Sequence, residues 1–585
     1  MKIIYKLLVT GCLILVTTLS CKEDFLEIRP FGSVSEETLL SEKGINGALI
    51  GAYRALVGRT NYNASTYLYP GDDTRIGSES GVNLYSVFTY NPADGYILTK
   101  WQYLFLGVAR SNTVLGMLGK VEDINPNTKL QFEAEAKVLR AYYHFYLTQL
   151  FKHVPWIDET VEYTAKNYLV PNTEDIYPKI EADLKFAANN LTETKSEVGR
   201  VNKWAAKSLL AKVYMYQYKY TEALSLLNEI IANGKTSNGL KYGLQAEYNL
   251  NFIQRGKNSK EAIFVAEMSV NDGSSSNKNG NPETNYNGPY GSPAASCCGW
   301  GAATFDLVEA YKTDPETGLP LLETYFETPV VNDNGIEGTA PFTPYQGTLD
   351  SRLDWTVGRR GIPYRDWGVF PGKPWVRNQR TSGPYVAIKN ICEQATAARD
   401  KASGAMTNNP VNLIRFADVL LWAAECEIEV GSLQKAEEYV NTVRARAANP
   451  VSWVYKYIDN SKPLNGFSKE PAANYKVGLY NGQFAANGKS YARKAVRFER
   501  RLEFAYEGHR YVDMSRWDGH DYDMASEMNA FFKREAPKLS NAANLYFQGN
   551  FVKGKNECLP IPQREIDLSV KPDGKSVLVQ NPGWD

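Results

Sequence analysis

Regularly spaced apolar residues constrain the fold of this 585-residue chain more than any other feature. Apolar side chains recur every three or four residues through long segments, which is the pattern of amphipathic helices. Small residues between the Leu and Tyr residues allow neighbouring helices to pack closely, as in tetratricopeptide (TPR) units. We therefore expect a mostly α-helical fold whose TPR-like pairs form a scaffold that presents a surface. The expected helices are 36–57, 96–119 and 130–151, and the expected pairs are 202–217 with 220–232 and 411–430 with 433–447.

The sequence changes character between about 235 and 400. Residues 271–282 are a polar run rich in Gly, Ser and Asn, which cannot bury enough apolar surface to order itself. Aromatic residues follow among glycines and prolines, without the spacing of a helix or a strand. Loops laid over a rigid body often carry binding functions. We expect irregular loops with minor β structure to carry a ligand surface here, on a helical scaffold formed mainly by 36–235 and 405–535.

The first 21 residues have the parts of a secretory signal. Lys2 and Lys6 precede an apolar run, 7–19, that ends at Ser20 and Cys21. A helix of that length spans about 20 Å, too short for the ~30 Å core of a bilayer, which argues against a membrane-spanning anchor. Residues 18–21 also resemble a bacterial lipobox, although the Leu lies two places before the cysteine instead of three. We expect a signal peptide at 1–20, lipidation at Cys21 and a single domain over 21–585.

Charge and cysteine usage argue against several classes of protein. The chain has 65 basic and 65 acidic residues, so nothing in its charge favours nucleic acid as a partner. Four histidines and the lack of a C-x-x-C pair argue against zinc, and no EF-hand loop is present. We expect no metal and no cofactor. One of the adjacent Cys297 and Cys298 could pair with a distant cysteine in an exported protein, but the odd number of cysteines after Cys21 leaves at least one thiol free.

Three blocks of sequence, in order along nearly the whole chain, resemble one family. The first is Asp24 to Thr38, which leads into 51–56. The second is 134–146, closed by 153–156, and the third is 497–517, followed by 559–567 and 580–584. Together they resemble the SusD-like (RagB/SusD) outer-membrane nutrient-binding lipoproteins. The residues after Cys21, Lys22-Glu23-Asp24, also resemble the acidic export tag of such lipoproteins.

The resemblance implies a SusD-like fold with four TPR-like pairs on one side and variable loops on the other. Members of this family sit as a hinged lid on a SusC-like, TonB-dependent transporter and capture glycans before import. A few members serve peptide uptake, and the pattern is not that of an enzyme. It implies a lipid-anchored, surface-exposed protein of the outer membrane, with an oligosaccharide as ligand and the SusC-like transporter as partner.

Seven aromatic residues are candidates for contact with a glycan. A pyranose presents polarised C–H bonds that suit the electron-rich face of Trp or Tyr, while its hydroxyls need fixed donors and acceptors. Any one of these rings could instead serve ordinary loop packing. The candidates are Tyr286, Tyr290, Trp300, Trp367 and Trp375 in the middle region, with Tyr67 and Tyr85, which flank Asp72 and Asp73, as a further wall; nearby polar residues are Asn285, Asn287, Arg365, Asp366, Arg377, Asn378 and Gln379.

A charged block near the C-terminus suggests a rival function. Glu499, Glu503 and Glu507 recur every four residues and so share one helical face, and His509 follows. Such groups could serve as the acid and base of a glycan-degrading enzyme. Arginines alternate with these acids, however, so we interpret the block as a network that locks helices together. The sequence is also compatible with a peptide-capturing protein of the same uptake system and with a purely structural scaffold.

Overall fold

The computed structural model describes residues 36–57, 71–75, 83–162, 167–282, 286–295, 297–402, 406–539 and 545–584. The expected signal peptide at 1–20, the expected lipidation site Cys21 and the candidate Tyr67 lie outside the described residues. Among the residues described, no helix is long and apolar enough to cross a membrane.

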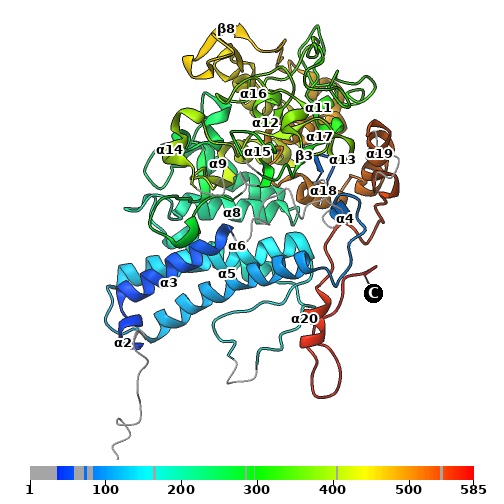
Figure 1. Ribbon diagram of the computed structural model, residues 1–585. Helices are drawn as coiled ribbons and strands as arrows, with labels where there is room; N and C mark the ends of the chain where they lie inside the picture. The colour runs from blue at the N-terminus through cyan, green and yellow to red at the C-terminus, as the bar shows by residue number, and fades with distance from the viewer. Residues whose placement is uncertain are drawn as a thin grey trace, which may run out of the picture.

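Two long helices form one side of the molecule, α5 (Gly95–Lys120) and α6 (Pro126–Phe151). They run side by side below the rest of the chain, with α3 (Glu42–Arg54) across them (Figure 1). Gly107 of α5 lies so close to α6 that a Cβ there would be 2.5 Å from the ring of Tyr143. This glycine therefore sets the separation of the two helices. The expected helix at 36–57 is divided into α2 (Glu36–Leu39), α3 and a short 3₁₀ turn.

The helices continue as a stack in which each packs against the next. From α6 the series runs through α7, α8 and α9 to α15, α16 and α17. The two expected helical pairs are confirmed, as α8 with α9 and as α15 with α16. The bounds are α7 (Tyr177–Asn190), α8 (Lys203–Met215), α9 (Tyr220–Asn233), α15 (Phe416–Val430), α16 (Leu433–Ala448) and α17 (Gln483–Phe504).

One expected helix begins later than its sequence pattern indicates. The expected helix begins at Val411, whereas α15 begins at Phe416. The intervening residues form β6 (Val411–Arg415), which pairs antiparallel with β2 (Ala262–Ala266). Tertiary pairing has overridden the helical periodicity at this point, and a run of Val, Leu and Ile accepts either conformation.

The remaining strands are short and also occur in antiparallel pairs. They pair as β1 (Thr74–Arg75) with β3 (Ala302–Ala303), β4 (Val357–Gly358) with β5 (Val386–Ala387), and β7 (Tyr455–Tyr457) with β8 (Phe467–Pro471). The other helices are α4 (Asn83–Ser86), α11 (Phe305–Ala310), α12 (Leu353–Thr356), α13 (Gln379–Ser382), α14 (Ala397–Asp400), α18 (Arg510–Asp518), α19 (Met524–Glu535) and α20 (Gln563–Leu568). The molecule is thus mainly helical with minor β structure, as expected.

Between α9 and α15, the chain leaves the helical stack for a long segment. Helix α9 packs directly against α15, although more than 180 residues separate them in sequence. The intervening chain consists largely of irregular segments (Figure 1, green). Many of them lie in the upper part of the view, away from α5, whereas Phe264 contacts Tyr142 of α6 and Asn279 accepts from Arg54 of α3. Besides the main core, these segments have a small core of their own, with Trp367 and Trp375 packed against it. It is formed by Ala294, Tyr364, Phe370, Val376, Val386, Ile388 and Ile391.

Candidate functional site

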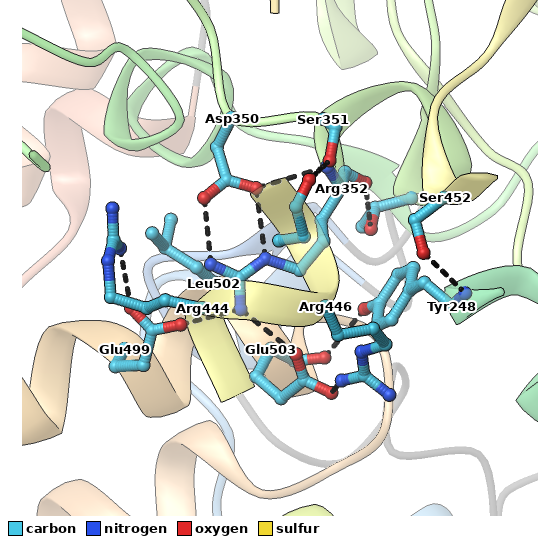
Figure 2. A network of polar contacts seen from close by, with 12 residues as sticks. Tyr248, Asp350, Ser351, Arg352, Arg444, Arg446, Ser452, Glu499, Leu502 and Glu503 are labelled. Carbon is cyan, nitrogen blue, oxygen red and sulfur yellow. Dashed lines mark hydrogen bonds and ion pairs between the residues drawn. The ribbon is translucent and has the colours of Figure 1, made fainter. Parts of the chain in front are cut away.

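The charged block forms a buried ionic network rather than an open site (Figure 2). Arg352 lies at its centre and donates to Glu499 at 2.7 Å and to Glu503 at 2.9 Å. The same guanidinium binds both oxygens of Asp350, and Arg444 donates to the second oxygen of Glu499 at 2.8 Å. All five side chains are fully buried.

The network joins distant parts of the chain through Glu503. Its second oxygen accepts from both Arg415, at the end of β6, and Arg446 of α16. Arg415 also binds Glu261, beside β2, and Glu507, just after α17, each at 2.8 Å. Charges removed from water are tolerated when each is paired and hydrogen-bonded in this way. The interpretation of this block as a structural network is confirmed.

The protonation states in this network do not suit acid–base chemistry. Burial alone would raise the pKa of the Glu503 carboxyl, but the charges of Arg446 and Arg415 hold it well below its ordinary value. Burial, with the charge of Lys212, holds the pKa of His509 well below its ordinary value, so this ring is neutral. A general acid needs a carboxyl with a raised pKa within reach of the substrate. Glu503 has neither property.

The acidic pair at 72–73 is also used within the protein. Arg510 binds Asp72 through two nitrogens at 2.9 and 2.7 Å. Arg501 donates to Asp73 at 2.8 Å, and both aspartates are buried. These buried carboxylates therefore tie the chain near β1 to α17 and α18.

The candidate Tyr85 lies in the core. Its ring is completely buried and stacks on Tyr90, with the ring centroids 5.1 Å apart. Its hydroxyl donates to Asp94, the residue that caps α5. Because no face of this ring is exposed, Tyr85 offers nothing for a sugar to stack on.

Two candidate rings form a pair at one end of the irregular region. The rings of Tyr286 and Trp300 lie 5.3 Å apart between centroids, with their planes inclined at 37°. The amide of Trp300 donates to the carbonyl of Tyr286 at 2.8 Å, which holds the two residues side by side. Both side chains are partly exposed while they pack against the main core. The backbone hydrogen bond and the core contacts therefore hold both rings in place while part of each ring stays exposed.

A third ring stands beside this pair. Tyr290 is 44% exposed, and the guanidinium of Arg377 lies 5.6 Å from its ring centroid. Arg377 also donates to the carbonyl of Cys298 at 3.3 Å. A cation over one face of a tyrosine ring holds the ring in place and supplies donors beside it. Cys298 is disulfide-bonded to its neighbour Cys297 and not to a distant cysteine.

The two remaining candidate tryptophans, Trp367 and Trp375, pack on the small core. Trp375 makes edge-to-face contacts with Tyr364 and Phe370, at centroid distances of 5.8 and 5.7 Å. The indole N–H of Trp367 donates to the carbonyl of Cys392 at 2.8 Å. Both tryptophans are partly exposed.

Several contacts connect the ring pair, Tyr290 and the small core. Ala294 belongs to the small core, although it follows Tyr290 by only four residues. Lys401 donates to the carbonyl of Ala294 at 2.8 Å and places its ammonium 5.4 Å from the ring of Trp367. Arg377, which covers Tyr290, directly follows the small-core residue Val376. The loop of residues 286–300 and the segment 364–377 therefore lie against one another. We call the exposed faces of Tyr286, Tyr290, Trp300, Trp367 and Trp375 the aromatic surface.

The polar neighbours expected to bind hydroxyls are mostly engaged in holding the loops. Buried Arg365 donates to the carbonyl of Lys389 at 3.0 Å, and Asp366 accepts from the amides of residues 394 and 395. Gln379 donates to Asp333 at 3.1 Å, and Asn378 caps α13. Asn287 is buried, and Asn285 lies outside the described residues.

Two features of this region were not predicted from the sequence. The disulfide between Cys297 and Cys298 lies in the loop that carries Tyr290 and Trp300. The only sequence signal for a disulfide beside these rings was the position of the two cysteines shortly before Trp300. The ammonium of Lys401 over Trp367 comes from a distant turn, and no local pattern indicates it.

A stack of helices that carries a long irregular region is the architecture of the SusD class. The chain belongs to the SusD family, because the model of that family matches residues 260–584. A second model, described as "Starch-binding associating with outer membrane", matches residues 24–215.

Known proteins agree with this assignment. SusD-like protein P25 of Formosa agariphila is 24% identical over 550 residues, covering 88% of this chain and 89% of the relative. A SusD homologue from Bacteroides thetaiotaomicron matches with a TM-score of 0.66 at 20% identity, covering 94% and 98% of the two chains. Surface glycan-binding protein A from the same organism, solved with laminarihexaose, matches with a TM-score of 0.59 at 20% identity, covering 92% and 99%. At this identity, the structural matches establish the shared fold.

Proposed function

We propose that this protein is a cell-surface, glycan-binding lipoprotein that captures oligosaccharides without cleaving them and delivers them to a SusC-like, TonB-dependent transporter. The observation that carries the proposal is the aromatic surface, in which five rings come from two irregular segments that lie against one another, with four of the rings packed on the main core or on the small core. Ring faces with adjacent cations suit the C–H faces and hydroxyls of a sugar.

Further observations support a binding role over catalysis. The carboxylates of the charged block are buried and neutralised by arginines, so they are poorly placed to attack a glycosidic bond. A protein of the same fold, surface glycan-binding protein A, was solved in complex with laminarihexaose. Outer-membrane placement is supported by the description of the matching family model, and the anchor we propose is a lipid on Cys21.

A ligand screen tests the proposal. The chain from residue 22 onward is presented to a glycan array that includes laminarihexaose, and to a matched panel of peptides. We expect binding to at least one oligosaccharide, no release of reducing ends, and no binding to the peptides. Binding to peptides alone would overturn the carbohydrate assignment and favour a peptide-capturing protein of the same uptake system.

Two substitutions separate this proposal from a purely structural scaffold. Trp300→Ala and Trp367→Ala each remove a ring from the aromatic surface, and each is expected to lower glycan affinity about tenfold, or ~1.4 kcal/mol. Isothermal titration calorimetry measures the change. A purely structural scaffold predicts instead that both substitutions leave all ligand binding unchanged.

Delivery to a transporter has its own test. Co-expression with a SusC-like transporter from the same organism, followed by mild detergent extraction and affinity purification, is expected to recover both proteins together. Recovery of this protein alone, under conditions in which a known SusC–SusD pair stays associated, would contradict the delivery step.

A further inference from the structure

The Cys297–Cys298 disulfide lies in a turn of the loop of residues 286–300, which carries three rings of the aromatic surface. It stands between Tyr290 and Trp300, and both cysteines are partly exposed. The other cysteines among the described residues, Cys392, Cys426 and Cys558, are buried free thiols. A reductant therefore has a single disulfide to act on in the described part of the chain. Disulfides persist in oxidising surroundings such as a cell surface, where we expect this protein to lie.

Backbone contacts hold this turn against the start of its own loop. The carbonyl of Tyr286 accepts from the amide of Cys298 at 3.4 Å as well as from that of Trp300. The amide of Gly299 donates to the carbonyl of Gly288 at 3.1 Å. Any movement of residues 297–299 would therefore move the base of the ring pair.

The turn also positions the third ring. Gly299 has a φ of +68°, and a Cβ there would lie 3.2 Å from the Cβ of Arg377 and 3.5 Å from that of Tyr290. Arg377 in turn donates to the carbonyl of Cys298 and covers the ring of Tyr290. The backbone at Cys298 is thus the common support of Tyr290, through Arg377, and of the Tyr286–Trp300 pair.

We propose that the Cys297–Cys298 disulfide is a positioning element of the ligand surface, which holds Tyr290 and Trp300 in the arrangement that binds a saccharide. A bond between neighbouring side chains closes a small ring and removes conformations that two free thiols would allow. The helical stack lies outside this ring and does not depend on it. The inference rests on the proposed function, because it concerns the same surface.

The experiment compares binding with and without the bond. The chain from residue 22 onward is titrated with laminarihexaose, or with the oligosaccharide retained in the array, before and after reduction by a phosphine. Each disulfide then becomes two thiols, and the phosphine becomes its oxide with an oxygen taken from water. The variant in which Cys297→Ser and Cys298→Ser are combined is treated identically. Mass spectrometry of the peptide that contains both residues reports whether the bond is present.

We expect reduction to weaken binding by the wild-type protein about fivefold to tenfold, and reoxidation to restore it. The serine variant should bind like the reduced protein, should not respond to the phosphine, and should keep the melting temperature of the wild type. The melting temperature separates positioning of the rings from support of the fold.

Several results would overturn the inference. Unchanged affinity after reduction would do so, as would free thiols in the exported protein, or a loss of melting temperature that accounts for the lost binding. If Trp300→Ala weakens binding while loss of the disulfide does not, only this inference fails. If the wild-type protein retains no oligosaccharide, the proposed function fails and this inference fails with it.

Discussion

At the scale of single residues, charged and aromatic side chains have different roles: the charged ones form buried ion pairs, and some of the aromatic ones stay partly exposed. Glutamates and arginines that would attract attention as catalytic groups are buried and paired, as Glu503 is with Arg352. Rings in the irregular region keep partly exposed faces, as Tyr290 does. Burial therefore distinguishes the structural groups from the candidate ligand contacts.

The first prediction concerns the buried network. Glu503→Gln removes a charge that Arg352, Arg415 and Arg446 share, so these buried cations keep only their other carboxylate partners and lose part of their compensation. We expect the free energy of unfolding to fall by about 3–5 kcal/mol, measured by urea denaturation. Glu470→Gln is the matched control, because Glu470 forms an exposed pair with Lys456 and should change stability little. Equal effects of the two substitutions would contradict this account of the network.

The same carboxyl predicts a pH dependence. The pKa of Glu503 is depressed in the folded protein below its ordinary value of 4.5. Its contribution to stability is therefore fully present above about pH 4.5 and is lost as the pH falls toward the folded-state pKa. The free energy of unfolding of the wild type should decrease below that pH more steeply than that of Glu503→Gln. Parallel curves from about pH 3 to about pH 6 would show that Glu503 is not the group responsible.

At the scale of elements, the close contact of α5 and α6 sets the base of the scaffold. Gly107→Ala would place a methyl group within 2.5 Å of the Tyr143 ring and force the helices apart. We expect a loss of about 1–3 kcal/mol in the free energy of unfolding. Gly116→Ala, on the same helix, meets open space and should be neutral or slightly stabilising, because Ala favours a helix over Gly. If both variants lose the same stability, the close approach is not what matters at Gly107.

Most helices could be predicted from the sequence, because long amphipathic periods fix both their type and their approximate position. The expected 96–119 helix is α5 (Gly95–Lys120), and the expected 130–151 helix ends at Phe151 as α6 does. Strand β6 could not be predicted, since its partner β2 lies far earlier in the sequence and pairing alone decides its conformation. The burial of Tyr85 was equally inaccessible, because it depends on contacts with Tyr90 and Asp94 that no local pattern reveals.

At the scale of the whole molecule, the irregular region is an insertion into a continuous helical stack. Helix α9 meets α15 directly, so the irregular residues between them can vary without interrupting the scaffold. This arrangement explains why the family resemblance predicted the fold, whereas the proposed ligand surface could be assembled only from the structure. The candidates at 286–300 and at 364–377 were predicted separately, and their contact through Arg377 and Ala294 became visible only in three dimensions.

One measurement tests the central claim most directly, namely that the aromatic surface binds glycan. Tyr290→Ala and Tyr168→Ala remove tyrosines of similar exposure, 44% and 42%, but Tyr168 lies outside the aromatic surface. Calorimetric titration with laminarihexaose, or with the oligosaccharide identified by the array, gives the affinity of each variant. We predict an affinity about tenfold lower for Tyr290→Ala and unchanged for Tyr168→Ala. Equal affinities for the wild type and Tyr290→Ala, with both variants folded, would contradict the account.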